Sequence, residues 1–209
     1  MRANHWAMVI CIFTLIPTGF YIASPFTVYA GETIDKFLMG NMRYIHILFG
    51  VILLFVFLWR IYMAFFSRFH ADWKDFFAWT DWKNTITQIK FYALISEKKP
   101  EHKYLYGPLQ SIAYGGVMFM LVLILLTGII LTGAGHDAGI TGWIYFFAKP
   151  FQNLLGGLAM VRFFHHILTW LFIIFIVVHI YMAFWYDVVF KEGTVSSMIN
   201  GRLFKRIQQ

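Results

Sequence analysis

The sequence has little charge and almost no cysteine. Only 13% of its 209 residues are charged, whereas 60% are hydrophobic and 21% are aromatic. An ordinary soluble domain is about 25% charged and roughly 45–50% apolar. The core of a soluble chain of this length could not bury the excess, so we expect an integral membrane protein. The single cysteine, Cys11, excludes intramolecular disulfides and multi-cysteine metal sites.

The net charge of +7 does not indicate a nucleic-acid-binding protein. In a membrane protein such an excess reflects the Lys and Arg of cytoplasmic segments. We therefore expect membrane lipid, and no nucleic acid, as a partner.

Four apolar stretches are long enough to cross about 30 Å of hydrocarbon at about 1.5 Å per residue. They cover residues 5–24, 44–66, 109–132 and 163–185. Pro17 in the first stretch predicts a kink or a local opening of that helix. The predicted fold is an all-α membrane protein, a four-transmembrane-helix bundle in one domain over residues 1–209.

Basic residues predict the orientation of the bundle. If both termini, Arg60 and the 67–107 loop share one side, that side holds 13 of the 17 Lys and Arg residues. By the positive-inside rule, both termini are then cytoplasmic. Two non-spanning segments, 73–96 and 133–162, are rich in aromatic residues and are expected at the cytoplasmic and the outer interface.

The histidines carry the chemistry, because an ionisable side chain within a span is costly and usually functional. His165 and His179 lie 14 residues apart on the last span, so both rings project from one face, about 21 Å apart along the axis. His166 projects to nearly the opposite side. It is expected to pack, to donate a hydrogen bond, or to meet a propionate or a partner at the interface.

The partners of these two histidines must lie at matching depths on other helices. His46 begins the second span on the outer side, and His5 begins the first span on the inner side. Depth therefore predicts two pairs, His46 with His165 and His5 with His179. Zinc or copper would need three or four converging ligands. Two imidazoles at each depth suit axial ligation of a haem, and since the chain has no C-x-x-C-H motif, that haem is not covalently attached.

Further residues recur at the depths of the predicted haems. Gly19 lies 14 residues after His5 and would let a porphyrin approach the backbone, or would serve helix packing. Arg60 lies 14 residues after His46 and would neutralise a propionate, or would extend to the membrane surface. Arg43 and Arg162 are candidates for propionate binding, for partner docking, or for interface anchoring.

Several motifs of the sequence resemble those of the b-type cytochrome subunits of membrane-bound NiFe hydrogenases, which are related to formate dehydrogenase gamma subunits. The resemblance covers nearly the whole chain. The motifs are Arg2-x-x-His5-Trp6 with Thr18-Gly19, Arg43-Tyr-Ile-His46, Trp59-Arg-Ile-Tyr62, Arg162-Phe-Phe-His165-His-Ile-Leu-Thr-Trp170 with Phe175-x-x-x-His179, and the tail 193–201.

The resemblance implies a bundle that encloses two b haems in the bacterial inner membrane. It implies hydrogenase small and large subunits on the periplasmic side, whose iron–sulfur clusters pass electrons through the chain to menaquinone or a related quinone. Hydrogen would be split in those subunits and not in this chain. His102 and Tyr104, in the loop before the third span, are candidates for the quinone site, although a solvated loop is the alternative.

Two other functions stay open at this stage. The chain could be the equivalent subunit of a formate dehydrogenase or of another periplasmic quinone-linked oxidoreductase. It could also be a haem-free transporter or channel that uses intramembrane histidines.

Overall fold

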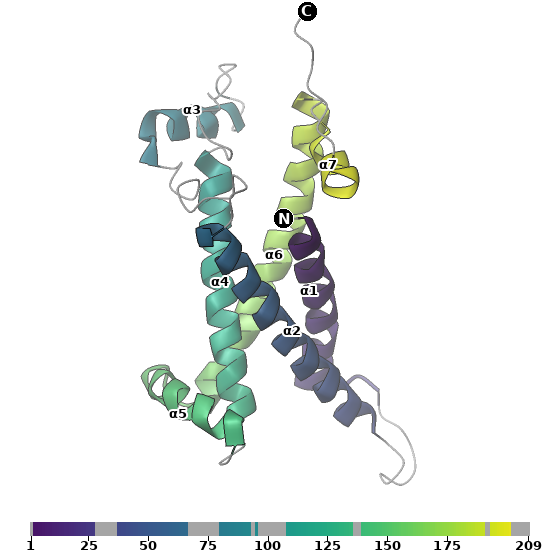
Figure 1. The fold of residues 1–209 in the computed structure, drawn as a ribbon, viewed down its shortest axis with the longest axis vertical. Coiled ribbons are helices and arrows are strands. Elements are labelled where there is room, and N and C mark those ends of the chain that lie inside the picture. The colour runs from purple at the N-terminus through teal and green to yellow at the C-terminus, as the bar shows by residue number, and fades with distance from the viewer. Residues whose placement is uncertain are drawn as a thin grey trace, which may run out of the picture. The chain divides into compact units, whose positions relative to one another are not determined.

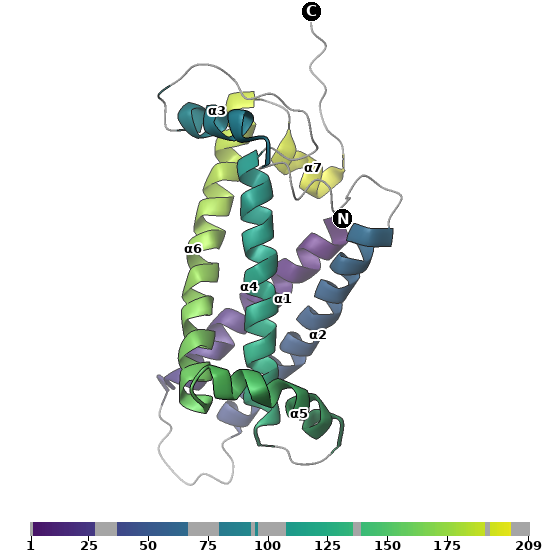
Figure 2. The ribbon, with the colours of Figure 1, turned by 90° about the vertical axis from the view of Figure 1, so that its left-hand side faces the viewer.

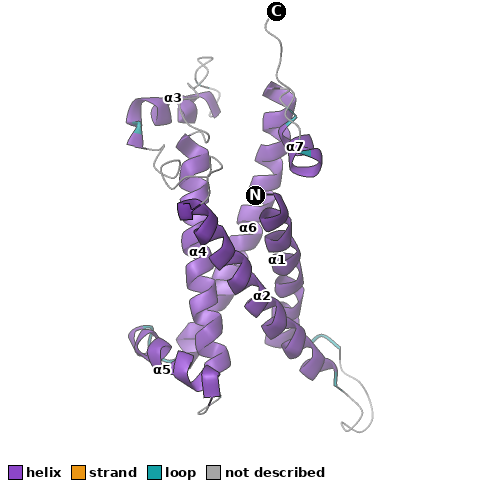
Figure 3. Cartoon of the chain, viewed as in Figure 1, coloured by secondary structure: helices purple, strands orange, loops and turns teal. Residues whose placement is uncertain are grey.

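The computed structural model describes residues 2–27, 37–66, 80–92, 95, 108–135, 139–190 and 193–201. Every regular element in these ranges is helical (Figure 3). Within them, four helices are long and apolar enough to cross a membrane: α1 (Arg2–Ala23), α2 (Leu38–Phe66), α4 (Pro108–Gly133) and α6 (Leu158–Phe190). Each overlaps a predicted span, which confirms, for the described residues, the prediction of a helical fold with four segments able to cross a membrane.

The four long helices are apolar around most of their circumference, as membrane spans are. Large hydrophobic side chains on them face outward; Phe13 of α1 is 59% exposed and Ile174 of α6 is 58% exposed. In water such surfaces would be unfavourable, whereas lipid solvates them. The exposed apolar surface therefore agrees with a protein whose solvent is the bilayer.

The chain forms two compact units, one made of residues 1–53 and 124–209 and the other of residues 54–123. Because the boundaries fall inside α2 and α4, each unit contains a part of both helices. The first unit also contains α1, α6 and two shorter helices, α5 (Gly139–Leu154) and α7 (Thr194–Asn200). The second unit contains the helix α3 (Trp82–Tyr92).

In the first unit, α1 and α6 lie side by side and antiparallel (Figure 1). The ring of His5 at the start of α1 faces that of His179, and Phe20 near the end of α1 contacts His166 and Trp170. Although Pro17 lies inside it, α1 is a single helix from Arg2 to Ala23.

At one end of the first unit, α5 runs across α4 and α6 (Figure 2). Ile130 of α4, Ala148 of α5 and Val161 of α6 form a buried cluster there. Gly156 and Gly157 make the turn into α6 with φ of 92° and 97°, which only glycine adopts readily. The cluster fixes the end of α4 against the start of α6, where His165 lies.

In the second unit, α3 is joined to the start of α4. The Gln88 side-chain oxygen accepts a hydrogen bond from the backbone N–H of Leu109 at 2.8 Å. This bond satisfies one of the backbone donors that the first turn of a helix leaves unpaired. Gln88 is itself only 2% exposed, and the other buried residues of α3, Asn84 and Thr85, are also polar, so α3 is packed by a polar face.

Candidate cofactor site

The four histidines predicted as ligands form two pairs in the first unit, and each pair joins α6 to another helix. The ring centroids of His46 on α2 and His165 lie 6.4 Å apart, and those of His5 on α1 and His179 lie 6.3 Å apart. A metal–imidazole bond of about 2 Å implies centroids about 6 Å apart for two imidazoles on opposite sides of one ion. Both separations match that distance, and the ligand role itself stays a prediction.

The His46 ring is held by a threonine of the neighbouring helix α1. Its Nδ1 lies 2.9 Å from the Thr18 hydroxyl oxygen, and that hydroxyl lies 2.7 Å from the carbonyl oxygen of Thr14. Because the hydroxyl donates its proton to the carbonyl, it accepts a hydrogen bond from Nδ1–H of the imidazole. That tautomer leaves the Nε2 lone pair of His46 available to a metal.

The His165 ring has the same arrangement with a different helix. Its Nδ1 lies 2.8 Å from the hydroxyl oxygen of Thr127 on α4, which donates to the carbonyl oxygen of Ile124 at 3.0 Å. Histidines that bind metals almost always donate the other ring N–H in this way. The donor set of the His46–His165 pair therefore fits axial ligation of a haem iron.

Two glycines let the helices approach these rings. A Cβ atom on Gly19 would lie 3.1 Å from Cε1 of His46, which is closer than ordinary van der Waals contact. A Cβ atom on Gly128 would lie 3.6 Å from Cε1 of His165. Gly19 is thus placed against the ring of a predicted ligand, which explains why a side chain is unfavourable there.

Thr18, Thr127 and Gly128 are absent from the candidate site predicted from sequence. A signal for them exists, since the dipeptide Thr18-Gly19 of the first span recurs as Thr127-Gly128 in the third. In each dipeptide the threonine hydroxyl holds an imidazole and the glycine faces the same ring.

The His5–His179 pair has a different environment. His179 stacks on Phe175 with ring centroids 5.4 Å apart and an angle of 20° between the planes. The His5 ring meets Trp6 edge-on at 5.5 Å. Nδ1 of His5 is buried and has no hydrogen-bond partner within the described part of the chain. This pair is therefore held by aromatic rings rather than by hydroxyl groups.

The helix α7 fixes the start of α1, where His5 lies. The Trp6 indole N–H donates to the carbonyl oxygen of Met198 at 2.9 Å, and the Arg2 guanidinium donates to that of Ile199 at 2.9 Å. Gly201 ends α7 with a φ of 81° and lies directly against the Arg2 guanidinium. The tail motif at 193–201 thus has a structural role beside a predicted ligand.

His166 points away from the paired rings, as its position on the helix predicts. It contacts Phe20 edge-on at 5.4 Å and accepts a hydrogen bond from the Trp170 indole N–H at 3.3 Å. Its described contacts are therefore packing against Phe20 of α1 and a hydrogen bond within α6, in which His166 is the acceptor and not the expected donor.

The remaining predicted residues are three arginines and the two quinone candidates. Arg60 belongs to the second unit, is only 3% exposed, and donates from Nε to the Tyr114 hydroxyl at 3.0 Å. Its side chain is buried and does not extend to the surface. Arg43 and Arg162 are exposed on α2 and α6. His102 and Tyr104 lie outside the described residues.

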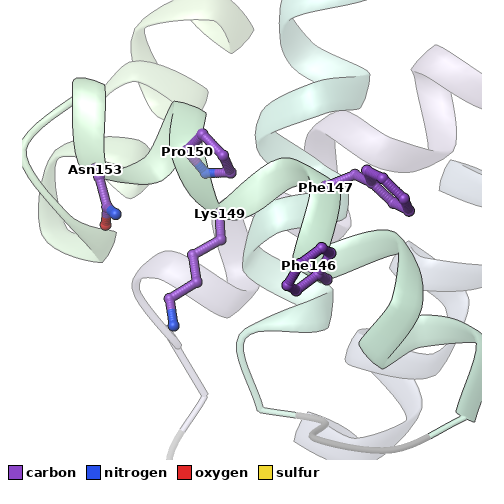
Figure 4. A pocket seen from close by; sticks show the side chains of 5 residues that line it. All are labelled: Phe146, Phe147, Lys149, Pro150 and Asn153. Atoms are coloured by element: carbon purple, nitrogen blue, oxygen red, sulfur yellow. The ribbon is translucent and has the colours of Figure 1, made fainter.

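A pocket on α5 is separate from both histidine pairs. Figure 4 shows the five side chains that line it: Phe146, Phe147, Lys149, Pro150 and Asn153. No histidine contributes to this lining, so the pocket is not the cofactor site.

Residues 1–201 match the family described as Prokaryotic cytochrome b561. The chain belongs to this family. Membership implies a b-type haem, which is held by axial protein ligands such as histidine. In the described part of the chain no three His, Cys, Asp or Glu side chains gather as a zinc site would need, whereas two histidine pairs are present. A b haem fits these side chains.

Several known proteins are similar to this chain over nearly its whole length. It is 32% identical to a "Probable Ni/Fe-hydrogenase B-type cytochrome subunit" of Rhizobium leguminosarum bv. viciae, over 98% of the chain and 87% of the relative. A protein of the same name from Azotobacter vinelandii is 32% identical over 98% of the chain and 86% of the relative. The Escherichia coli K12 "Probable Ni/Fe-hydrogenase 1 B-type cytochrome subunit" is 28% identical over 96% of the chain and 86% of the relative. These relatives confirm the resemblance seen in the sequence.

Proposed function

We propose that the chain is the di-haem b-type cytochrome subunit of a membrane-bound NiFe hydrogenase. It anchors the hydrogenase and transfers electrons from its iron–sulfur clusters across the membrane to quinone. The observation that carries this proposal is the presence of two His–His pairs, with centroids 6.4 Å and 6.3 Å apart, whose α6 members are 14 residues apart.

The two pairs are arranged for transfer through the thickness of a membrane. His165 and His179 are separated by about 21 Å along the α6 axis, roughly two-thirds of the 30 Å depth of the hydrocarbon core. Bound haem supplies one-electron redox chemistry. The histidines of each pair would hold a haem iron between them and would leave no open position for a substrate, which favours electron transfer over oxygen chemistry.

The orientation of the chain supports the direction of this path. The distribution of basic residues supports cytoplasmic termini, an orientation in which the His46–His165 pair is near the periplasm and the His5–His179 pair near the cytoplasm. The names of the relatives support hydrogenase small and large subunits as partners. Hydrogen is activated in those subunits, and the chain contributes the haem ligands in the bacterial inner membrane.

The arginines and the quinone candidates complete the proposal. Arg43 and Arg162, both exposed, would bind haem propionates or the docked subunit, and the buried Arg60 would bind a propionate. His102 and Tyr104 are proposed for reduction of menaquinone or a related quinone near the cytoplasmic face. If H102A reduces quinone at the wild-type rate in the assembled complex, His102 has no part in that site.

Purification of the intact complex from membranes in mild detergent tests the proposed function. We expect nickel in the preparation, reduced b-type absorption bands when hydrogen is added, and loss of those bands when a quinone analogue follows. Molybdenum or tungsten instead of nickel would identify a formate-dehydrogenase-like complex. Absence of b-type bands after chemical reduction would exclude both cytochrome functions and leave the transporter or channel.

A further inference from the structure

We infer that Thr18 and Thr127 are positioning residues for the haem held by His46 and His165, and that their hydroxyl groups lower its reduction potential relative to a site without them. This inference rests on the proposed function, because it concerns a haem at this pair. It concerns neither ligand identity nor partner, and it can fail while both of those stand.

Each threonine hydroxyl makes a second hydrogen bond in addition to the one with its histidine. Thr18 donates to Thr14 O and Thr127 to Ile124 O, in both cases the carbonyl of the preceding turn of the same helix. Such bonds orient the hydroxyl, so its lone pairs point away from its own helix. The lone pairs lie 2.9 Å and 2.8 Å from Nδ1 of His46 and His165.

The support for each ligand comes from a helix other than its own. Thr18 on α1 holds His46 on α2, and Thr127 on α4 holds His165 on α6. Neither imidazole can rotate about its Cβ–Cγ bond without losing a hydrogen bond to another element. The pair is therefore preorganised, with both Nδ1 atoms protonated and both Nε2 atoms available to the iron.

The same hydrogen bonds alter the strength of the ligands. An imidazole that donates from Nδ1–H is a more basic ligand at Nε2. A more basic ligand stabilises ferric over ferrous iron, and hydrogen bonding beyond the ligands is one of the ways in which proteins set haem potentials. Removal of either hydroxyl should therefore raise the potential of this haem.

The second pair provides an internal reference. Within the described residues, Nδ1 of His5 has no hydrogen-bond partner, and His179 is supported by the stacked ring of Phe175. Because Thr18 and Thr127 contact only the first pair, their removal should change one of the two haems and leave the other unchanged.

Redox titration of the purified, haem-loaded complex tests the inference. In T18V and T127V only the hydroxyl is exchanged for a methyl group of similar shape. At a fixed solution potential we expect the ferrous-to-ferric ratio of one haem to rise roughly tenfold, which corresponds to about 59 mV for one electron. The electron paramagnetic resonance g values of the same ferric haem should shift. T18S and T127S keep the hydroxyl and should stay close to wild type.

The matched control is T87V. Thr87 lies on α3, and its hydroxyl donates to the carbonyl oxygen of Lys83 in the preceding turn at 2.9 Å. This variant removes an equivalent helix hydroxyl that belongs to the second unit, whereas both histidine pairs belong to the first, so both haems should keep their wild-type potentials.

Two results would overturn the inference: unchanged potentials and g values in T18V and T127V, or loss of haem in the Val and Ser variants alike. Loss of one haem in the Val variants, with retention in the Ser variants, supports it because the hydroxyl is then what holds the site. A wild-type protein without haem refutes the proposed function and is recognised before any variant is made.

Discussion

His5 and His179 lie near opposite ends of the sequence, yet their ring centroids are 6.3 Å apart in the folded chain. The contact joins the start of α1 to the second half of α6, and its centroid separation is close to the 6.4 Å of His46 and His165. Two histidine pairs that share α6 are the basis of the first predictions below.

The pairing of the histidines predicts which substitutions cause additive losses of haem. H46A and H165A should each remove the same haem, so the double variant should retain as much haem as either single variant. H5A combined with H165A should remove both haems, because the two residues belong to different pairs. Haem per polypeptide, measured after purification, gives the comparison.

H166A is the control for this series, since His166 is adjacent to His165 but packs against Phe20 and Trp170. It should keep the wild-type haem content. Additive loss of haem from H46A and H165A would contradict the pairing.

The two glycines that face the rings should differ in their tolerance of a methyl group. In G19A the new Cβ would lie 3.1 Å from the His46 ring, so the ring must shift, and the haem at this pair should change its spectrum or be partly lost. In G128A the distance to the His165 ring is 3.6 Å, an ordinary contact, and the site should be unaffected. Alanine favours helix by about 1 kcal/mol relative to glycine in both, so helix propensity cannot explain a loss in G19A.

Low-temperature absorption spectra of the reduced protein resolve this comparison. Equal spectra for G19A, G128A and wild type would show that Gly19 has room for a side chain.

The contacts of α7 predict that the C-terminal segment stabilises the His5–His179 site. W6F removes a hydrogen bond of about 1 kcal/mol to Met198 O. In G201A the alanine must adopt the left-handed backbone that Gly201 has, at a cost of about 1–2 kcal/mol. Its Cβ atom would also lie against the Arg2 guanidinium. Both should lower the temperature at which one haem is released, and only one.

W143F is the control for this prediction, because Trp143 on α5 is 72% exposed. Its haem release should match that of wild type. Release of the two haems together in W6F would contradict a local role for α7.

The contact between Arg60 and Tyr114 should stabilise the second unit against thermal unfolding. Tyr114 accepts a hydrogen bond from Arg60 at 3.0 Å and lies 5.3 Å from its guanidinium carbon, ring centroid to Cζ. Loss of the acceptor in Y114F should cost about 1–3 kcal/mol, because Arg60 is buried. Y62F, at a 60% exposed tyrosine of α2, should be neutral in the same thermal unfolding assay in detergent. Equal melting temperatures for the two variants would refute the prediction.

Much of this architecture could be predicted from the sequence because the bilayer imposes a simple rule. Spans must be long and apolar, so the four membrane-crossing helices follow from hydropathy alone. The spacing of His165 and His179 also predicts a shared face, since helix geometry relates residues on one element. The same argument separates His166 from its neighbour.

The residues that sequence did not identify act between helices. Thr18 and Thr127 contact histidines because of the orientation in which α1 packs against α2 and α4 packs against α6. The residue periodicity within one helix does not reveal how that helix is oriented against its neighbour. The Thr-Gly dipeptide alone is also insufficient, because it occurs again at 132–133 and 141–142.

The ratio of haem b to polypeptide in the purified wild-type protein tests the central claim most directly. The haem is counted from the absorbance of its pyridine complex, and the polypeptide by quantitative amino-acid analysis. Two histidine pairs predict two haems for each chain. A ratio of one would contradict the two-pair account, and a ratio of zero would contradict the cytochrome function.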